Sequence, residues 1–72
     1  MNSFRDVIAA WPTLEDFVAD AGTTANTAKQ WRTRDKIPDE HWRRVADGAS
    51  KRRIKGVTLE FLAALAEAKR AA

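Results

Sequence analysis

The residues of this chain that are best suited to a specific chemistry lie in the string ANTAKQWRTR, residues 25–34. Asn26 and Gln30 carry amides that can form two hydrogen bonds with adenine, and Lys29 can bond to guanine. The string also contains two arginines and no acidic residue, whereas a purely structural helix would be expected to carry some acids. This composition predicts a segment that meets the bases of a nucleic acid, with an ordinary solvated face as the alternative.

Metal and enzyme chemistry lack the residues they need. The chain has no cysteine, which excludes a disulfide framework and a cysteine-based zinc site. Its one histidine, His41, could hold a metal only together with several carboxylates, and we expect it to be a surface or boundary residue. The sequence shows no phosphate-binding Gly-rich loop and no recognisable Ser/His/Asp arrangement. We therefore expect no catalytic residue, metal, cofactor or small-molecule ligand, and an enzyme is the least favoured class.

The net charge of +3 hides a strong asymmetry along the chain. Residues 1–28 hold one basic and four acidic residues, a net charge of −3. Residues 29–55 hold ten basic and four acidic residues, a net charge of +6, and residues 56–72 balance at zero. Clustered lysine and arginine are the electrostatic signature of a polyanion binder. Because the excess begins within the polar string, it favours nucleic acid over a chance accumulation of surface charge.

The length of 72 residues allows a single domain, residues 1–72. A domain of this size buries only about 60% of the surface of its unfolded chain, so we expect a helical bundle that a partner subunit could complete. No apolar run approaches the ~20 residues that span a membrane. The N-terminal string MNSFRDVIAAW contains Asp6 and no basic leader, unlike a signal peptide. These features predict a cytoplasmic, nucleoid-associated protein without membrane partners.

Two short helices are predicted before the polar string. The first spans residues 3–11, with Ser3 as its N-cap, and ends at Pro12, which cannot continue a helical ladder. The second follows Thr13 as its N-cap and stops at Gly22, which can adopt the left-handed conformation that turns the chain. Apolar residues at helical spacing form their inward stripes: Phe4, Val7, Ile8 and Trp11, then Leu14, Phe17, Val18 and Ala21.

A third helix, residues 25–34, is predicted to follow Thr24 as its N-cap. Ala28 and Trp31 are expected to face inward, and Trp31 is predicted to be a core residue rather than an aromatic that stacks on nucleic acid. The remaining positions form a polar outer face: Asn26, Thr27, Lys29, Gln30 and Thr33.

A fourth helix is predicted to have Pro38 in its first turn, with Ile37 extended and directed into the core. Its apolar stripe is Trp42, Val45, Ala46 and Ala49. The following stretch, Gly48 to Gly56, is expected to be looser and carries the cations Lys51, Arg52, Arg53 and Lys55. These cations can meet phosphates or can complement the negative end of a helix, and the two roles are compatible.

Thr58 is predicted to cap a fifth helix that occupies residues 58–70 and has little polar face. A terminal helix that is apolar on more than one side is under-covered in a small monomer. We expect it either to lie in a deep groove or to pack against a second copy. The predicted homodimer interface consists of Leu59, Phe61, Leu62 and Leu65.

Residues 13–33 resemble the helix-turn-helix of the lambda-repressor and Cro-like superfamily. In that pattern a glycine opens the turn, a serine or threonine two residues later caps the recognition helix, and a large apolar residue lies nine after the glycine; here they are Gly22, Thr24 and Trp31. The continuation Trp31-Arg32-x-Arg34-x-x-Ile37-Pro38 looks like small phage-derived Cro-like regulators. The resemblance covers residues 13–46 and implies an all-α, five-helix lambda-repressor-like fold with its helix-turn-helix at residues 13–34.

The sequence departs from that pattern at two places. Relatives usually place a small alanine four before the turn glycine and a valine or isoleucine against it, whereas here the pair is Val18 and Ala28. This is a volume-conserving exchange, which cores tolerate. Leu14 stands where many relatives have a glutamine that touches a backbone phosphate, so that contact is not expected here.

The resemblance and the charge pattern together predict two sets of DNA contacts. Residues expected to face the bases are Ala25, Asn26, Lys29, Gln30 and Thr33. Residues expected to meet phosphates are Thr24, Arg32, Arg34, Arg43, Arg44, Arg52 and Arg53.

The sequence therefore favours a transcriptional regulator, in the first instance a repressor, that binds double-stranded DNA as a homodimer on an inverted repeat. A protein-interaction adaptor or antirepressor that uses the apolar C-terminal helix is one alternative. A nucleoid-type DNA binder that is insensitive to sequence is another.

Overall fold

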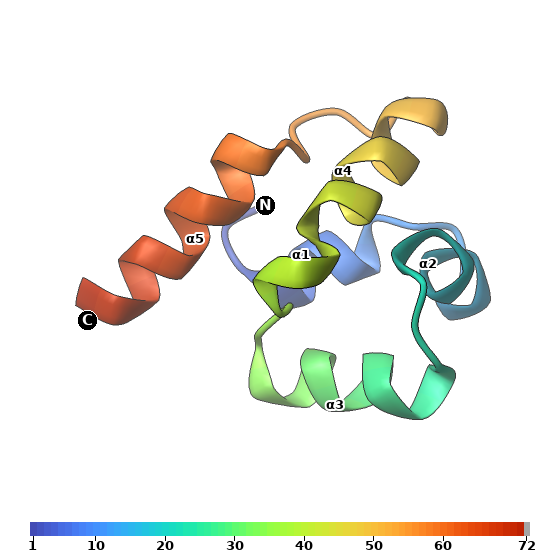
Figure 1. Cartoon of the computed structure of the whole chain (residues 1–72), viewed down its shortest axis with the longest axis horizontal. Coiled ribbons are helices and arrows are strands. Elements are labelled where there is room, and N and C mark those ends of the chain that lie inside the picture. The colour runs from blue at the N-terminus through green and yellow to red at the C-terminus, as the bar shows by residue number, and fades with distance from the viewer. Residues whose placement is uncertain (72) are drawn as a thin grey trace.

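The computed structural model describes residues 1–71 and is built from helices (Figure 1). The elements are α1 (Phe4–Ala9), α2 (Leu14–Ala21), α3 (Ala25–Arg34), the 3-10 turn η1 (Asp39–His41), α4 (Trp42–Lys51) and α5 (Leu59–Ala71). Residues 1–71 contain no strand, so the predicted all-α class with five α-helices is confirmed. Within this part of the chain, no helix combines the length and apolar character needed to cross a bilayer.

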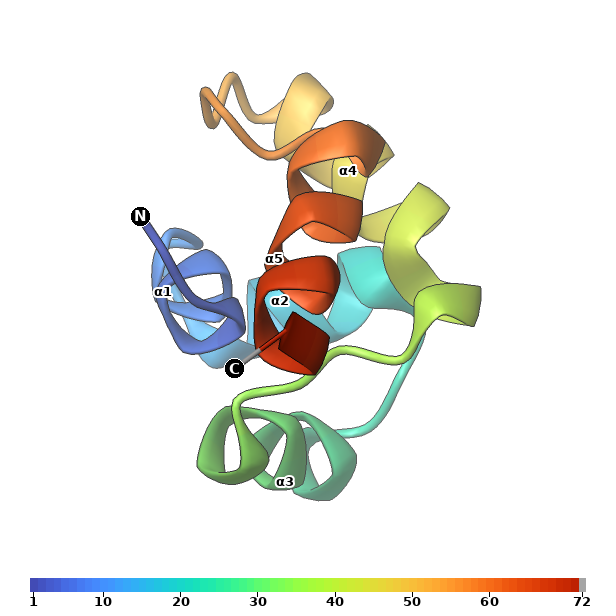
Figure 2. The ribbon, with the colours of Figure 1, turned by 90° about the vertical axis from the view of Figure 1, so that its left-hand side faces the viewer.

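The helices pack into a body of 31 × 25 × 20 Å. The most extensive helix contact joins α2 to α4, while α1 packs mainly on α3 and α5 packs on α4. In Figure 2, which faces α5, this helix lies in front of α2 and α4, with α1 to its left. In both views α3 lies at one edge of the molecule, far from the connection between α4 and α5. One long side of α3 is therefore left outside the bundle.

Threonine and serine hydroxyls cap the N-termini of α1, α2, α3 and α5, as predicted. Each accepts a hydrogen bond from the backbone N–H three residues later, at 3.0–3.2 Å. Such a cap stabilises a helix by about 1 kcal/mol. The capping residues are Ser3, Thr13, Thr24 and Thr58.

Three predicted boundaries are wrong by part of a turn or more. α1 ends at Ala9 rather than at Trp11, because the chain already turns away ahead of the proline. Pro38 does not lie in the first turn of α4: it precedes η1, and α4 itself begins at Trp42. The stretch from Gly48 is not loose at its start, because α4 continues to Lys51.

Aromatic rings organise the core. Phe17 is fully buried and makes edge-to-face contacts with Trp11 and Trp31, at centroid distances of 5.1 and 6.3 Å. Ile37 is also buried, as predicted for the residue before the proline. The buried apolar residues are Phe4, Val7, Ile8, Trp11, Phe17, Ala21, Ala28, Trp31, Ile37, Val45, Ala49, Val57, Leu62 and Leu65.

The position of α5 changes the interpretation of its apolar residues. Leu62 and Leu65 are 0% and 9% exposed, so they belong to the core of the single chain and cannot serve as an open contact surface. Phe61 is half-buried, and Leu59 is 42% exposed. Leu62 and Leu65 therefore pack within the single chain, as expected if the helix lies in a groove of its own bundle. We correct the predicted homodimer interface by removing these two residues from it.

Candidate nucleic-acid interface

The outer face of α3 is exposed to solvent apart from Thr27, which is half-buried and bonded to the hydroxyl of Thr24. Within residues 1–71, no side-chain hydrogen bond or ion pair engages Asn26, Lys29 or Gln30. All five predicted base-facing residues lie on the exposed side, and the helix carries no acidic residue. Those five are Ala25, Asn26, Lys29, Gln30 and Thr33. The face therefore offers unpaired amide and ammonium groups from a single rigid element.

The N-terminal end of α3 is held by the turn that precedes it. Gly22 adopts the left-handed conformation, with φ +72°, and ends α2 as predicted. A side chain at this position would be strained by that φ, and a Cβ would lie 2.6 Å from the guanidinium Nε of Arg44. Thr24 then caps α3, and its hydroxyl also bonds to that of Thr27 at 3.0 Å. The turn thus fixes where α3 begins.

The C-terminal end of α3 is held by two other helices. The Nε of Arg5, in α1, donates to the carbonyl oxygen of Arg32 at 3.0 Å, and its backbone N–H donates to Asp35 Oδ1 at 2.9 Å. The ammonium of Lys69, in α5, donates to the carbonyl oxygens of Arg34 and Asp35. Positive charge suits the negative end of a helix. These contacts join residues 27–35 positions apart, and no local sequence pattern predicted them.

Trp31 anchors the inner side of α3. It is 8% exposed, contacts Phe17 edge-to-face and packs against the ring of His41 at a centroid distance of 4.8 Å. The Nδ1 atom of His41 lies 2.9 Å from the carbonyl oxygen of Ala21 at the end of α2. The predicted core position of Trp31 and the predicted boundary position of His41 are both confirmed.

The predicted phosphate contacts fall into two groups. Six of them are exposed and lie in three places. Thr24 caps α3, Arg32 and Arg34 lie on α3, Arg43 and Arg44 lie on α4, and Arg53 lies in the loop after α4. Arg44 also donates from Nε to the carbonyl oxygen of Asp20 at 3.3 Å. Arg52 differs, because its Nε lies 2.6 Å from Asp20 Oδ2 in an ion pair. We therefore remove Arg52 from the phosphate set.

Asp20 joins three helix ends through its carboxylate, a role that the sequence did not indicate. Its carboxylate accepts hydrogen bonds from Trp11 Nε1 at 2.8 Å and from Arg52 at 2.6 and 3.4 Å. Those bonds tie the end of α1, the end of α2 and the end of α4 together. The bonds from Arg52 and then from Trp11 hold the pKa of Asp20 below its ordinary value, and the same pairing raises the pKa of Arg52. The partners lie 9 and 32 residues from Asp20, so its role could not be deduced from helical spacing.

No protein-family model matches this chain, and the comparisons with curated proteins and with solved structures found no match either. The interface is therefore interpreted from its own geometry and charge.

Proposed function

We propose that this protein is a sequence-specific DNA-binding regulator with a lambda-repressor-like helix-turn-helix formed by α2, the turn at Gly22 and α3. The observation that carries the proposal is the outer face of α3, which is exposed, free of acids and lined with unpaired amide and ammonium groups. That face also lies on a helix whose N-terminus is capped by Thr24 and whose C-terminal carbonyl oxygens accept hydrogen bonds from Arg5 and Lys69. A rigid element of this kind suits direct reading of base edges.

In this proposal α3 lies in the major groove with its N-terminal half against the bases. Asn26 and Gln30 would pair with adenine, and Lys29 with guanine. Ala25 and Thr33 would contribute apolar or hydroxyl contacts. Occupation of a promoter would then repress transcription by blocking other proteins.

Phosphate contacts supply most of the affinity in such a complex and depend on salt. The exposed cations Arg32 and Arg34 on α3 and Arg43 on α4 would supply them. Arg44 on α4 is exposed as well, whereas Arg53 lies in the connection between α4 and α5, far from α3, and is left out of the proposed contacts. The residues proposed to contact DNA on α3 and α4 thus include the cations Lys29, Arg32, Arg34, Arg43 and Arg44 and no acid.

Selection from a pool of randomised DNA duplexes tests this proposal. At about physiological salt, we expect the wild-type protein to enrich one motif whose half-sites are inverted and about 34 Å apart, centre to centre, if two copies bind together. Binding without enrichment of any motif would instead indicate a nucleoid-type protein. No binding at all would contradict the proposal and favour a protein-interaction module.

A further inference from the structure

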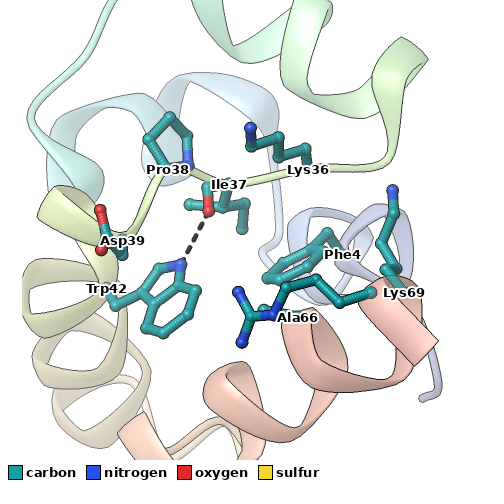
Figure 3. A pocket seen from close by; sticks show the side chains of 9 residues that line it. Phe4, Lys36, Ile37, Pro38, Asp39, Trp42, Ala66 and Lys69 are labelled. Carbon is teal, nitrogen blue, oxygen red and sulfur yellow. Dashed lines mark hydrogen bonds between the residues drawn. The ribbon is translucent and has the colours of Figure 1, made fainter.

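A groove remains open on one side of the bundle after folding (Figure 3). Its volume is about 560 Å³, which is within the range of sites that bind ligands. It lies between the connection that follows α3, the beginnings of α1 and α4, and the C-terminal half of α5. None of the residues proposed to contact DNA lines it, so the groove is a separate feature of the molecule.

The interior of the groove is apolar. Phe4 and Ile37 line it and are almost fully buried themselves. Pro38 and Trp42 on one side, and Ala66 on α5, are half-buried and keep part of their surface toward the groove. A large apolar side chain placed there would pack against an aromatic ring and lose contact with water.

Two contacts hold the groove in shape. Trp42 Nε1 donates to the carbonyl oxygen of Ile37 at 2.7 Å, and the indole stacks on the ring of Phe4 with the centroids 6.3 Å apart. The ammonium of Lys69 donates to the last carbonyl oxygens of α3 and so ties α5 to the other side of the groove. A site that is already formed costs less ordering when it binds a partner.

The charges at the rim indicate the chemistry of an occupant. Lys36 lies on the connection after α3, whereas Lys69 and Arg70 lie on α5, and Asp39 is the one acid among the lining residues. Within residues 1–71, Lys36 takes part in no ion pair, and Arg70 pairs only with Glu67, where both side chains are more than 70% exposed. Exposed pairs of this kind are weak. Both cations are therefore available to carboxylates of another molecule.

We propose that the groove binds an acidic peptide segment of another protein. One large apolar side chain of the segment enters the groove, and carboxylates on either side of it pair with Lys36 and with Arg70. The position of the cations favours a peptide over a small organic acid. They stand on two separate elements, so an extended chain with acids on both sides of an apolar residue meets both, whereas one carboxylate meets one.

The expected complex is weak. A single groove with a few rim charges makes a small interface, and such interfaces are typically transient, so we expect a dissociation constant on the order of tens of micromolar. The proposal goes beyond DNA binding and does not rest on it, because the two surfaces share no residue and the test uses no DNA.

An NMR titration of the full chain, labelled with ¹⁵N, tests the proposal at physiological salt. The probe is an acetylated and amidated pentapeptide with one phenylalanine between two pairs of glutamates. We expect saturable shifts of amide signals at Phe4 and in residues 36–42 and 66–70, with the outer face of α3 unchanged. A peptide with alanine in place of the phenylalanine should bind about ten-fold more weakly, since it buries no large apolar group.

Charge reversals at the rim test the ionic contacts. Lys36→Glu and Arg70→Glu should each raise the dissociation constant about three- to ten-fold. Lys55→Glu is the matched control: it changes the net charge equally, but position 55 is exposed on the connection between α4 and α5 and does not line the groove. At physiological salt, charges beyond about 8 Å are largely screened, so this variant should bind like the wild type.

Filling the groove tests the apolar contact. Ala66→Leu should remove the preference for the phenylalanine peptide over the alanine peptide, whereas Ala64→Leu, at an exposed position of α5 outside the groove, should keep it.

The absence of saturable binding, equal binding of the two peptides, or shifts confined to the outer face of α3 would overturn the proposal. Equal effects of Lys36→Glu and Lys55→Glu would do the same. So would binding of phenylpropionate as tight as that of the pentapeptide, because a small organic acid would then be a sufficient occupant.

Discussion

Trp31→Ala is expected to lower the free energy of unfolding by about 3–5 kcal/mol, the range observed when a large buried aromatic is truncated. Trp31 is 8% exposed and connects α3 to Phe17 on one side and to His41 on the other. Removing the indole leaves a cavity between α3 and the rest of the bundle. A domain of 72 residues is typically stable by about 4–11 kcal/mol, so the loss takes up much of its stability.

Urea denaturation followed by circular dichroism measures this effect. Gln30→Ala is the matched control on the same helix, because its side chain is exposed and unpaired, and its change should stay within about 0.5 kcal/mol. If Trp31→Ala kept the unfolding midpoint of the wild type, the packing of Trp31 would not be what holds α3 against the bundle.

Asp20→Asn is expected to lower the free energy of unfolding at neutral pH by about 1.5–3 kcal/mol, the range for hydrogen bonds to a charged group. The substitution keeps the shape of the side chain but removes the charge that pairs with Arg52. The side chain of Asp20 is 20% exposed, so solvent weakens this pair only in part. Trp11 also loses its charged acceptor.

The same contact predicts a dependence on pH. Because the pKa of Asp20 is lower in the folded chain than its unfolded value of about 3.9, its contribution is fully present above that value. It is lost as the pH falls through the folded pKa. The difference in unfolding free energy between wild type and Asp20→Asn should therefore shrink below about pH 4 and vanish once Asp20 is protonated in both states.

Asp16→Asn is the control for this prediction. Asp16 lies 3.8 Å from the same guanidinium, but its side chain is 41% exposed, and a surface pair of this kind contributes between zero and about 1 kcal/mol. An equal effect of the two substitutions, or a difference that persists after full protonation, would show that Asp20 does not join the three helix ends.

Local signals predicted much of the fold. Helix N-caps such as Thr13 and Thr24 depend on residues three positions apart, and the left-handed Gly22 depends on a single residue, so the sequence displays them directly. The burial of Trp31 follows from its helical spacing to Ala28. Those features sufficed to bound α3 correctly at residues 25–34.

Contacts between distant residues were not predictable in this way. The bonds of Lys69 to the end of α3 and of Arg52 to Asp20 depend on how the helices pack, and lysine and arginine look alike in sequence whether they are free or paired. The apolar stripes of α5 were equally ambiguous. Leu62 is buried and Leu59 exposed because α5 presents one side to α4, and composition alone does not say which side.

The direct test of the central claim is a titration of a specific and a scrambled duplex with wild type, Lys29→Ala and Arg43→Ala. We expect Lys29→Ala to weaken binding to the specific duplex by about 1–3 kcal/mol and to leave the scrambled duplex nearly unaffected. Arg43→Ala, which removes an exposed cation of α4, should weaken both duplexes alike and lower the slope of affinity against salt by about one. Equal losses on both duplexes for Lys29→Ala would contradict the assignment of α3 as the element that reads base sequence.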